Sequence, residues 1–192
     1  MNVSWDNCWA LSDNHWHHES MLKAFGRYDT FQTVEEMNAG MIRRWNDEVP
    51  TSGIVYFTGD MFYTAKSPEI LKVLDQLNGS ICLVKGNHDH FDSACKKRFQ
   101  WIKDYYKLKI EDDEGIRRQI VMSHYPFLEW DGYYRGSWHI FGHTHNKRSE
   151  NPDELSLNVS VENWDYTPVS FAKIKEAMKK KTKWELYNEV DC

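Results

Sequence analysis

The sequence predicts a single domain of the α/β class, in which buried β-strands alternate along the chain with helices. Short apolar runs recur along the 192 residues, and between them lie stretches whose apolar residues have helical spacing. Hydrophobic residues make up 41% and charged residues 28% of the chain, as expected of a globular domain. Because no repeat or linker interrupts this pattern, residues 1–192 are expected to form one domain.

The expected strands are short apolar runs of the kind that form buried strands. They cover residues 8–12, 54–58, 81–85, 120–123, 138–141 and 157–161. Two helices are predicted from their ends. Thr33 and Glu36 form a capping box before an apolar stripe. Ser67 and Pro68 are typical of a helix start, and Asn78-Gly79 is expected to end that second helix.

Composition argues against several classes of function. The net charge of −5 is the opposite of what a general nucleic-acid-binding protein needs, so no duplex partner is expected. The cysteines at 8, 82, 95 and 192 form no C-x-x-C motif and no signal peptide is visible, so a reduced, cytoplasmic protein is expected. The sequence has no run of about 18 apolar residues, so no membrane span is expected. The lysines at 179–181 and 183 are interpreted as a solvated helix end rather than a phosphate-binding tail. The oligomeric state is left open.

Polar residues at the carboxyl ends of five predicted strands carry the functional signal. The residues are Asp13, His15, Asp60, Asn87, His124, His143 and His145. Because ligands of open α/β sheets bind outside the carboxyl ends of the strands, we expect these side chains to meet at one rim.

The residue types at this rim predict metal ions. Imidazole and carboxylate ligands suit manganese, which we expect, or iron, zinc or nickel, and the lack of Cys argues against a structural zinc site. Seven ligands are too many for one four-coordinate ion, so two divalent ions that share a carboxylate are expected. Two such ions clamp a phosphoryl group and lower the pKa of a bridging water. His88, beside Asn87, is the predicted proton donor to the leaving oxygen.

These motifs resemble those of the calcineurin-like metallophosphoesterase superfamily, in particular its compact bacterial and phage members without a cap domain. The matching string is Asp13-x-His15, Gly59-Asp60, Gly86-Asn87-His88-Asp89, His124 and Gly142-His143-x-His145. The run 158–162 lies outside the metal motifs and also matches. The resemblance extends from about residue 8 to about residue 175.

The resemblance implies a four-layer α-β-β-α sandwich, in which two mixed β-sheets are flanked by helices. The implied ligands divide into Asp13, His15 and His145 for the first ion and Asn87, His124 and His143 for the second. Asp60 would bridge both ions. Asn87 would also contact substrate, and His88 would assist the leaving group while a metal-bridging hydroxide attacks phosphorus in line.

The chain departs from the family pattern at two places. Relatives usually have an aromatic residue, a Gly and a His after the first ligand pair, but this chain has Trp16-His17-His18. His18 fits the usual His and is a predicted substrate contact, whereas His17 is expected at the surface or rim. Arg27 lies in a stretch that resembles a family Arg-Pro-Phe run. A phosphate contact is predicted for it, with an ordinary surface ion pair as the alternative.

Other aromatic and histidine side chains have less specific interpretations. Trp16, Trp130, Tyr133 and Tyr134 could stack on a nucleobase, although packing in the core or at a rim is preferred. His139 lies inside a predicted strand and is expected to be structural.

The predicted function is hydrolysis of a small phosphoester or nucleotide-type substrate, by a phosphodiesterase or phosphatase. Diesters are favoured because a site without a cap domain has room for the second ester substituent. No Arg-Gly follows Gly59-Asp60, which disfavours a protein phosphatase. Two alternatives stay open: a nuclease that acts on short or single-stranded nucleic acid, and a catalytically silent metal-binding module.

Overall fold

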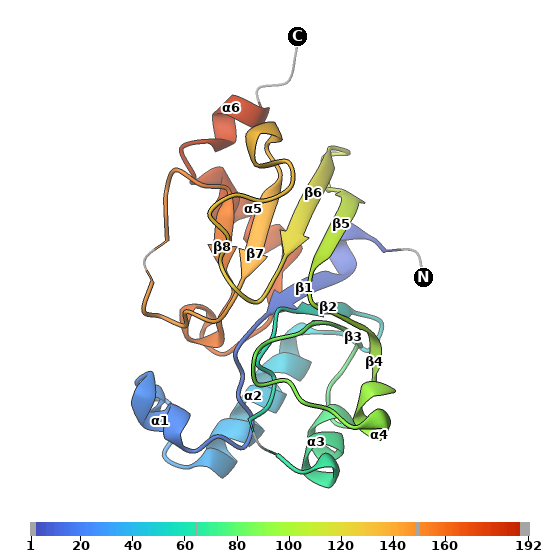
Figure 1. Cartoon of the computed structure of the whole chain (residues 1–192), viewed down its shortest axis with the longest axis vertical. Helices are drawn as coiled ribbons and strands as arrows, with labels where there is room; N and C mark the ends of the chain where they lie inside the picture. Colours follow the sequence, from blue (N-terminus) through green and yellow to red (C-terminus); the bar gives the residue numbers. More distant parts are fainter. Residues whose placement is uncertain (1–2, 64, 149, 189–192) are drawn as a thin grey trace.

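Two mixed β-sheets form the centre of the molecule (Figure 1). The structure is a computed structural model that describes residues 3–63, 65–148 and 150–188. The first sheet has the strand order β4-β3-β2-β1-β9 and the second the order β5-β6-β7-β8. Parallel pairs dominate both sheets, and one antiparallel pair in each, β1 with β9 and β5 with β6, makes them mixed.

The strands of the two sheets are all short. Those of the first sheet are β1 (Cys8–Leu11), β2 (Ile54–Phe57), β3 (Ser80–Val84), β4 (Phe99–Lys103) and β9 (Val169–Ser170). Those of the second are β5 (Tyr106–Glu111), β6 (Arg117–Met122), β7 (Trp138–Phe141) and β8 (Ser156–Asn158). Each of the six predicted strands overlaps an observed strand. The last one ends at Asn158 rather than 161, because a 3-10 helix begins at Val161.

Helices and 3-10 turns connect the strands. The α-helices are α1 (Ser20–Ala24), α2 (Val34–Glu48), α3 (Ser67–Leu74), α4 (Ser93–Lys96), α5 (Phe171–Lys179) and α6 (Trp184–Asn188). The 3-10 helices are η1 (Trp5–Asn7), η2 (Arg27–Asp29), η3 (Tyr133–Arg135) and η4 (Val161–Trp164). The longest, α2, has 15 residues, and no helix in the described ranges is long and apolar enough to cross a bilayer.

The observed ends of the two predicted helices agree with the prediction for α2 but differ from it for α3. The α2 start is confirmed, because the Thr33 side chain accepts a hydrogen bond from the Glu36 N–H at 3.1 Å. The N-cap of α3 is Lys66 rather than Ser67, and the Glu69 carboxylate accepts a hydrogen bond from the Lys66 N–H at 2.8 Å. This helix ends at Leu74, before the predicted Asn78-Gly79 stop.

The first sheet separates two hydrophobic cores. On β1, Trp9 and Leu11 face the core shared with α1–α4, which gather on the side of the sheet away from the second sheet (Figure 1). Their neighbours Cys8 and Ala10 face the core between the sheets, to which α5 also contributes. Because both faces are buried, the strands read in sequence as continuous apolar runs. The structure therefore confirms an α/β fold of two mixed sheets with flanking helices.

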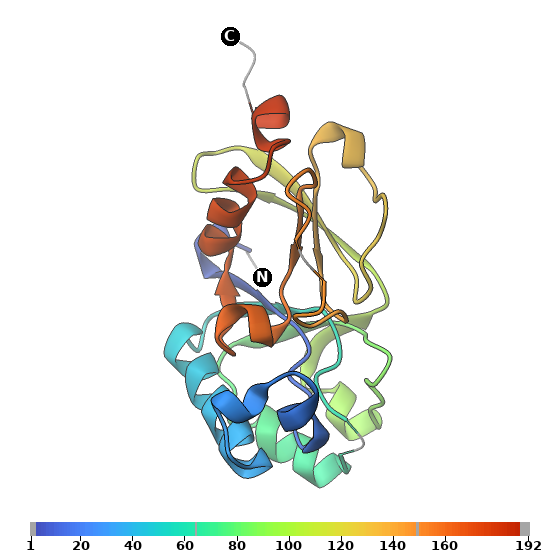
Figure 2. The ribbon, with the colours of Figure 1, turned by 90° about the vertical axis from the view of Figure 1, so that its left-hand side faces the viewer.

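The outer face of the second sheet is covered by the segment 125–137. Figure 2 shows α5 on one side of this sheet and the segment that contains η3 on the other. Phe127 stacks on the buried His139 with ring centroids 5.2 Å apart, and the Trp130 ring lies 5.0 Å from the same imidazole. His139 is thus enclosed by packing, and burial lowers its pKa to about 4.

The lysines and cysteines of the chain have structural surroundings. Lys181 is buried and pairs with Glu150, and Lys183 donates to the hydroxyl of Tyr133, so this part of the lysine run packs against the protein instead of forming the solvated helix end that was expected. The described cysteines at 8, 82 and 95 are free and buried, and the one at 192 lies outside the described residues.

Candidate metal centre

Five of the seven predicted ligands lie on left-handed backbone. The φ angles are 61° for Asp13, 50° for His15, 58° for Asp60, 68° for His143 and 48° for His145. This conformation costs a residue with a Cβ atom roughly 1–2 kcal/mol. It persists where the surrounding structure enforces it, and such positions cluster at functional sites. The chain turns sharply as it leaves β1, β2 and β7, and these turns bring the ligand side chains together.

Asp13, His15 and His145 form the first group of ligand atoms. One ligand atom from each lies within 4.8 Å of the others, and Nε2 of His145 is 3.8 Å from Oδ1 of Asp13. Oδ1 of Asp13 and both ring nitrogens of His15 are buried without a hydrogen-bond partner. Because buried polar atoms are nearly always paired in folded proteins, the unpaired Oδ1 of Asp13 and Nε2 of His15, which lie 3.9 Å apart, fit a divalent metal ion that His145 would also ligate.

The other oxygen of Asp13 is held by the protein. Oδ2 accepts hydrogen bonds from the Ser160 hydroxyl at 2.8 Å and from the His143 N–H at 2.9 Å. These contacts fix the carboxylate so that Oδ1 faces His15 and His145. Ligand-orienting contacts of this kind are typical of metal sites.

Asp60, His124 and His143 form the second group. Nδ1 of His143 lies 3.2 Å and Oδ1 of Asn87 lies 3.1 Å from Nε2 of His124. Nδ1 of His124 lies 2.9 Å from the Thr58 carbonyl oxygen, which can only accept a hydrogen bond. The proton of a neutral His124 therefore sits on Nδ1, and Nε2 keeps a lone pair for a metal ion.

Asp60 lies between the two groups. Its Oδ2 is 3.7 Å from Nε2 of His15 and 3.3 Å from Nε2 of His124, and its Oδ1 accepts a hydrogen bond from the His88 N–H at 2.8 Å. Burial raises the pKa of Asp60, but without a metal ion a protonated His124, through its hydrogen bond and charge, and the His88 N–H outweigh burial and lower the pKa to about 2. An ionised carboxylate therefore faces ligands of both groups, as a bridging residue requires.

Burial acts on the charge states of the first group. It lowers the pKa of His15 to about 2, so the ring is neutral and can offer a lone pair. It raises the pKa of Asp13, which is fully buried. A carboxylate in this position is ionised more easily beside positive charge, and a divalent ion would supply that charge.

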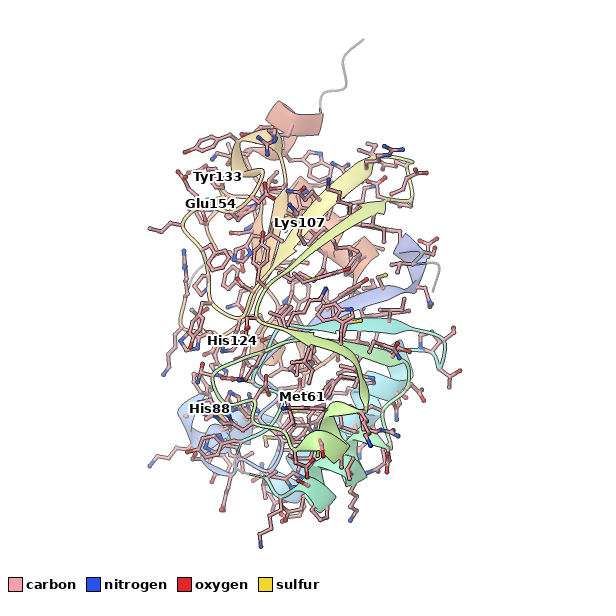
Figure 3. The ribbon with its side chains drawn as sticks, turned by 45° about the vertical axis from the view of Figure 1, so that its right-hand side comes forward. Met61, His88, Lys107, His124, Tyr133 and Glu154 are labelled. Carbon is pink, nitrogen blue, oxygen red and sulfur yellow. The ribbon has the colours of Figure 1, made fainter. Side chains whose placement is uncertain are left out.

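His88 lies at the mouth of the site. Its side chain is 38% exposed, and Nε2 lies 4.0 Å from Oδ2 of Asp60. The ring packs edge-on against His15 at 5.4 Å and against Tyr63 at 4.9 Å. Figure 3 shows His88 near His124, below the carboxyl end of β6. This placement lets the imidazole reach solvent and a bound substrate without being a ligand.

His18 and His17 occupy different positions around the mouth. The His18 ring stacks on Tyr63 at 3.7 Å and lies 5.5 Å from the His15 ring, so it borders the site. His17 is exposed, and its N–H donates to Oδ1 of Asn38 at 3.1 Å. Its φ of 67° explains why a glycine is usual at this position of the family pattern.

Arg27 points into the protein. Its guanidinium is fully buried and donates to the carbonyl oxygens of Asn14 at 2.7 Å and Asp13 at 2.8 Å. It also donates from Nε to Oε1 of Glu162 at 2.9 Å. This geometry favours a role in positioning the Asp-x-His loop over the phosphate contact expected from the sequence, because the guanidinium is buried and its N–H groups donate to that loop and to Glu162. The ion pair with Glu162 is likewise buried rather than at the surface.

Two carboxylates that the sequence did not single out support the ligands. Oε1 of Glu162 accepts a hydrogen bond from Nδ1 of His145 at 2.9 Å. The buried Asp89 accepts hydrogen bonds from the N–H groups of Asp60, Met61 and Gly86 at 2.8, 2.9 and 2.9 Å. Asp89 could have been found from its place in the Gly-Asn-His-Asp motif, whereas only the run 158–162 hinted at Glu162.

Two glycines give the ligand loops the space to approach one another. A Cβ atom on Gly86 would lie 2.2 Å from Oδ1 of Asp60, and one on Gly142 would lie 2.4 Å from Oδ2 of Asp13. No side chain fits at either place, so the glycines of the Gly-Asn-His and Gly-His-x-His motifs are steric requirements of the site.

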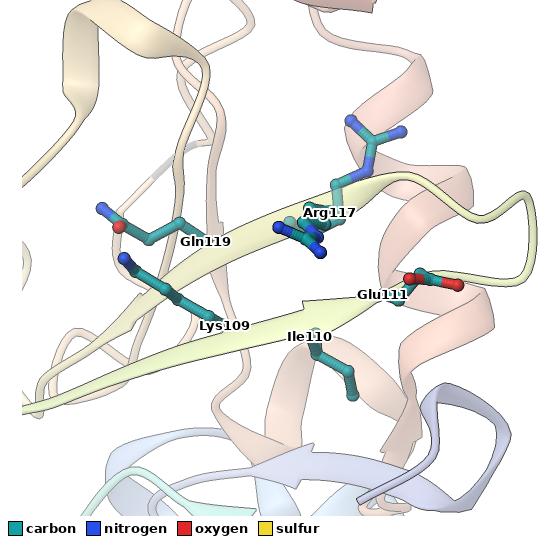
Figure 4. A pocket seen from close by; sticks show the side chains of 6 residues that line it. Lys109, Ile110, Glu111, Arg117 and Gln119 are labelled. Atoms are coloured by element: carbon teal, nitrogen blue, oxygen red, sulfur yellow. The ribbon is translucent and has the colours of Figure 1, made fainter.

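The aromatic residues considered for base stacking, and one hollow on the second sheet, lie apart from the two ligand groups. Trp16 is fully buried, and the Trp130 indole donates to the Ser137 carbonyl at 3.0 Å, as expected of packing residues. A hollow of about 530 Å³ on β5 and β6 is lined by residues that include Lys109 and Arg117 (Figure 4). None of the seven predicted ligands lines it, so the chemistry is placed at the junction of the sheets.

Comparisons with known proteins identify the family to which the chain belongs. Residues 7–110 match the calcineurin-like phosphoesterase family. The chain is 32% identical over 184 residues to an uncharacterised protein of Methanocaldococcus jannaschii, and the match covers 93% of this chain and 94% of that protein. A protein of unknown function from Aquifex aeolicus has a similar fold, with a TM-score of 0.63 at 21% identity, over 88% of this chain and 98% of that one. A zinc complex of Vps29 from Entamoeba histolytica matches with a TM-score of 0.43 at 17% identity, over 79% of this chain and 72% of that one. The family match covers more than half of the described chain and includes its first four ligand positions, and we conclude that this protein belongs to the calcineurin-like phosphoesterase family.

Proposed function

We propose that this protein hydrolyses phosphoesters with the help of two divalent metal ions, and that manganese is the metal. The observation that carries the proposal is the position of Asp60, whose Oδ2 lies 3.7 Å from a histidine of the first ligand group and 3.3 Å from one of the second. When two ions are bound about 3.5–4 Å apart, they stabilise phosphoryl charge and lower the pKa of water.

The residues of the chain have separate roles in this proposal. Asp13, His15 and His145 hold one ion, Asn87, His124 and His143 hold the other, and Asp60 contacts both. His88 donates a proton from its ring to the leaving oxygen as the P–O bond breaks, so that the oxygen departs as an alcohol. The support for this role is the 38% exposure of His88 beside the ligands and the distance of 4.0 Å between its Nε2 and Asp60.

The substrates are small phosphoesters of the nucleotide type, with diesters favoured over monoesters. Asn87 and His143 are exposed, so the second ligand group opens directly to solvent, whereas the first is buried. An open site accommodates the second ester substituent of a diester. It also suits the alternative substrate, a short single-stranded nucleic acid, whereas a long duplex would be repelled by the net charge of −5.

Metal content and turnover of two variants test the proposal. Hydrolysis of bis(p-nitrophenyl) phosphate should need added manganese and stop with EDTA. Asp60→Asn should lower total bound metal and turnover together, whereas Asp13→Asn should mainly empty one site. The exposed Asp75, which pairs with Arg98 away from the ligands, gives the control Asp75→Asn. Two bound ions without turnover of any phosphoester would indicate the silent metal-binding module, and equal metal loss from both site variants would refute the bridge.

A further inference from the structure

A hollow of about 330 Å³ opens beside the second ligand group. Asn87 and His124 line it together with Lys85, Asp104, Tyr125 and Phe127, among others. The volume is at the lower end of the range of about 300–1,000 Å³ for ligand pockets, so it has room for one ring system rather than a polymer. Its position next to two predicted ligands means that a molecule bound to them would extend into it.

Aromatic rings form one wall of this first hollow. The Tyr125 hydroxyl donates to Oδ1 of Asn87 at 3.2 Å, and the Tyr125 ring lies 4.5 Å from the ring of His143. Phe127 is held in place by its N–H, which donates to Nε2 of the buried His139 at 3.2 Å. Rings held in this way at the edge of a site are suited to stacking on a planar group such as a nucleobase.

A second hollow of about 510 Å³ continues from the first, because the two share Lys85 and Asp104 as lining residues. Lys85, Lys96 and Lys103 line it together with Asp104 and the buried Asp89, whose carboxylate is occupied by hydrogen bonds from three backbone N–H groups. Among the described residues none of these three ammonium groups has a carboxylate within 4.0 Å, and Lys103 instead lies 4.5 Å from the Tyr106 ring. In a chain with net charge −5, three lysines without carboxylate partners around one hollow make a local site for an anion.

We propose that this surface binds the rest of a nucleotide substrate, with its base against Phe127 and a second phosphate among Lys85, Lys96 and Lys103. The inference rests on the proposed function, because it extends the substrate from the reacting phosphoryl group. It identifies the substrate class as nucleotides that carry a further phosphate, such as a dinucleotide with a terminal phosphate. Asp104, which lines both hollows, can accept a hydrogen bond from an amino group of the base.

Two probes that differ by one phosphate test the second subsite directly. Calorimetric titration of the manganese-loaded protein should show adenosine 3′,5′-bisphosphate binding roughly ten-fold more tightly than adenosine 5′-monophosphate. The double variant Lys85→Gln with Lys96→Gln should remove most of this preference, which should also fall as salt rises. The exposed lysine of α3 gives the control Lys72→Gln, which should keep the preference. A wild-type protein without the preference, or a double variant that retains it, would overturn the inference.

The base subsite needs a separate variant. Phe127→Ala should weaken binding of both adenosine probes by roughly ten-fold. Leu128→Ala removes an 86% exposed side chain in the same segment that does not line the hollow, and it should leave both affinities unchanged. Hydrolysis of methyl p-nitrophenyl phosphate, which has neither base nor second phosphate, reports on the proposed function alone. If that substrate is hydrolysed while the bisphosphate preference is absent, the proposed function stands and this inference fails; if it is not hydrolysed, the proposed function fails whatever the probes show.

Discussion

Oε1 of Glu162 accepts a hydrogen bond from Nδ1 of His145 at 2.9 Å, and Nε2 of the same ring faces Oδ1 of Asp13 at 3.8 Å. The carboxylate therefore fixes both the orientation of the ring and the nitrogen that carries its proton. Burial raises the pKa of Glu162, but the His145 hydrogen bond and the charge of Arg27 outweigh burial and lower it. An ionised, buried carboxylate behind a metal-binding histidine makes that histidine a better ligand.

Removal of this carboxylate should weaken metal binding. We expect Glu162→Ala to lower the affinity of the first site for manganese about 10- to 100-fold, as measured by competition with a chelator. Glu162→Gln should restore part of the affinity, because the amide oxygen can still accept the His145 proton. Circular dichroism should confirm that both variants fold. The exposed Glu129, which accepts a hydrogen bond from Tyr134, gives the control Glu129→Ala. Wild-type affinity in Glu162→Ala would contradict the positioning role.

The role of His88 should depend on the leaving group. An alkoxide such as a ribose oxygen needs a proton as it leaves, whereas nitrophenolate leaves readily as the anion. General acid catalysis contributes roughly a hundred- to ten-thousand-fold, so His88→Ala should lose far more activity on a dinucleotide than on a nitrophenyl diester. Metal content should stay near that of the wild type, because the seven ligands are intact. Equal losses on both substrates, at matched metal occupancy, would show that His88 stabilises phosphoryl charge rather than donating a proton.

Alanine usually gives a more stable protein than glycine, but the left-handed backbone at His17 should reverse this order of stability. Relief of the roughly 1–2 kcal/mol cost of this conformation outweighs the 0.5–1 kcal/mol by which glycine usually destabilises. We expect His17→Gly to exceed His17→Ala in free energy of unfolding by about 0.5–1 kcal/mol. Urea denaturation of both variants measures the difference. At the exposed Arg43 of α2, the same pair of substitutions should give the opposite order. Alanine as the better residue at both positions would be inconsistent with strain at His17.

Much of the ligand set could be predicted from the sequence because its members follow buried strands. A strand with both faces buried appears as an apolar run, and a His or Asp directly after it is conspicuous. The supporting contacts had no such signal. Glu162 and His145 are 17 residues apart, and the buried Arg27 is 135 residues from Glu162, so only folding brings them together. Because its partner is so distant in the sequence, Arg27 was predicted to contact phosphate rather than Glu162.

Three observed strands, β4, β5 and β9, were not predicted from the sequence. For β5 and β9 the lack of a long apolar run is the physical reason. On β5 every second residue from Lys107 to Glu111 is charged and exposed, because the segment 125–137 leaves the outer face of this edge strand open to solvent. A search for apolar runs passes over such a strand, whereas its two-residue period does predict it. β9 has two residues, which is too short for any periodicity, and it is held by pairing with Trp9 and Ala10 of β1.

A buried ionic cluster at the β5–β6 turn should make stability depend on acidity. Burial raises the pKa of Asp112, but the Ile116 N–H and the cations Arg118 and Lys175 outweigh it and lower the pKa from 3.8 to about 2. A carboxyl with a depressed pKa in the folded state stabilises the fold above its unfolded pKa. That contribution, about 2 kcal/mol, is lost as the pH falls from about 4 through 2.

Urea denaturation in EDTA at pH 7, 4 and 2.5 measures the effect of Asp112. The stability difference between the wild type and Asp112→Asn should be largest at pH 7 and should shrink toward pH 2.5. In Asp113→Asn, whose carboxylate is half exposed and contacts Lys175, the difference from the wild type should change less with pH. A constant gap between the wild type and Asp112→Asn at the three pH values would rule out the depressed pKa.

The ligands come from both sheets: Asp13, His15, Asp60 and Asn87 follow strands of the first, and His124, His143 and His145 follow strands of the second. The distance between the two ligand groups therefore depends on how one sheet is aligned against the other. Side chains between the sheets, such as Ala10 and Ile140, act as spacers that set this alignment. A methyl group added or removed there, far from any reacting atom, would change the fit of a pair of ions. The interior of the domain would thus set the distance between the two proposed ions, and the bound ions would in turn link the two sheets.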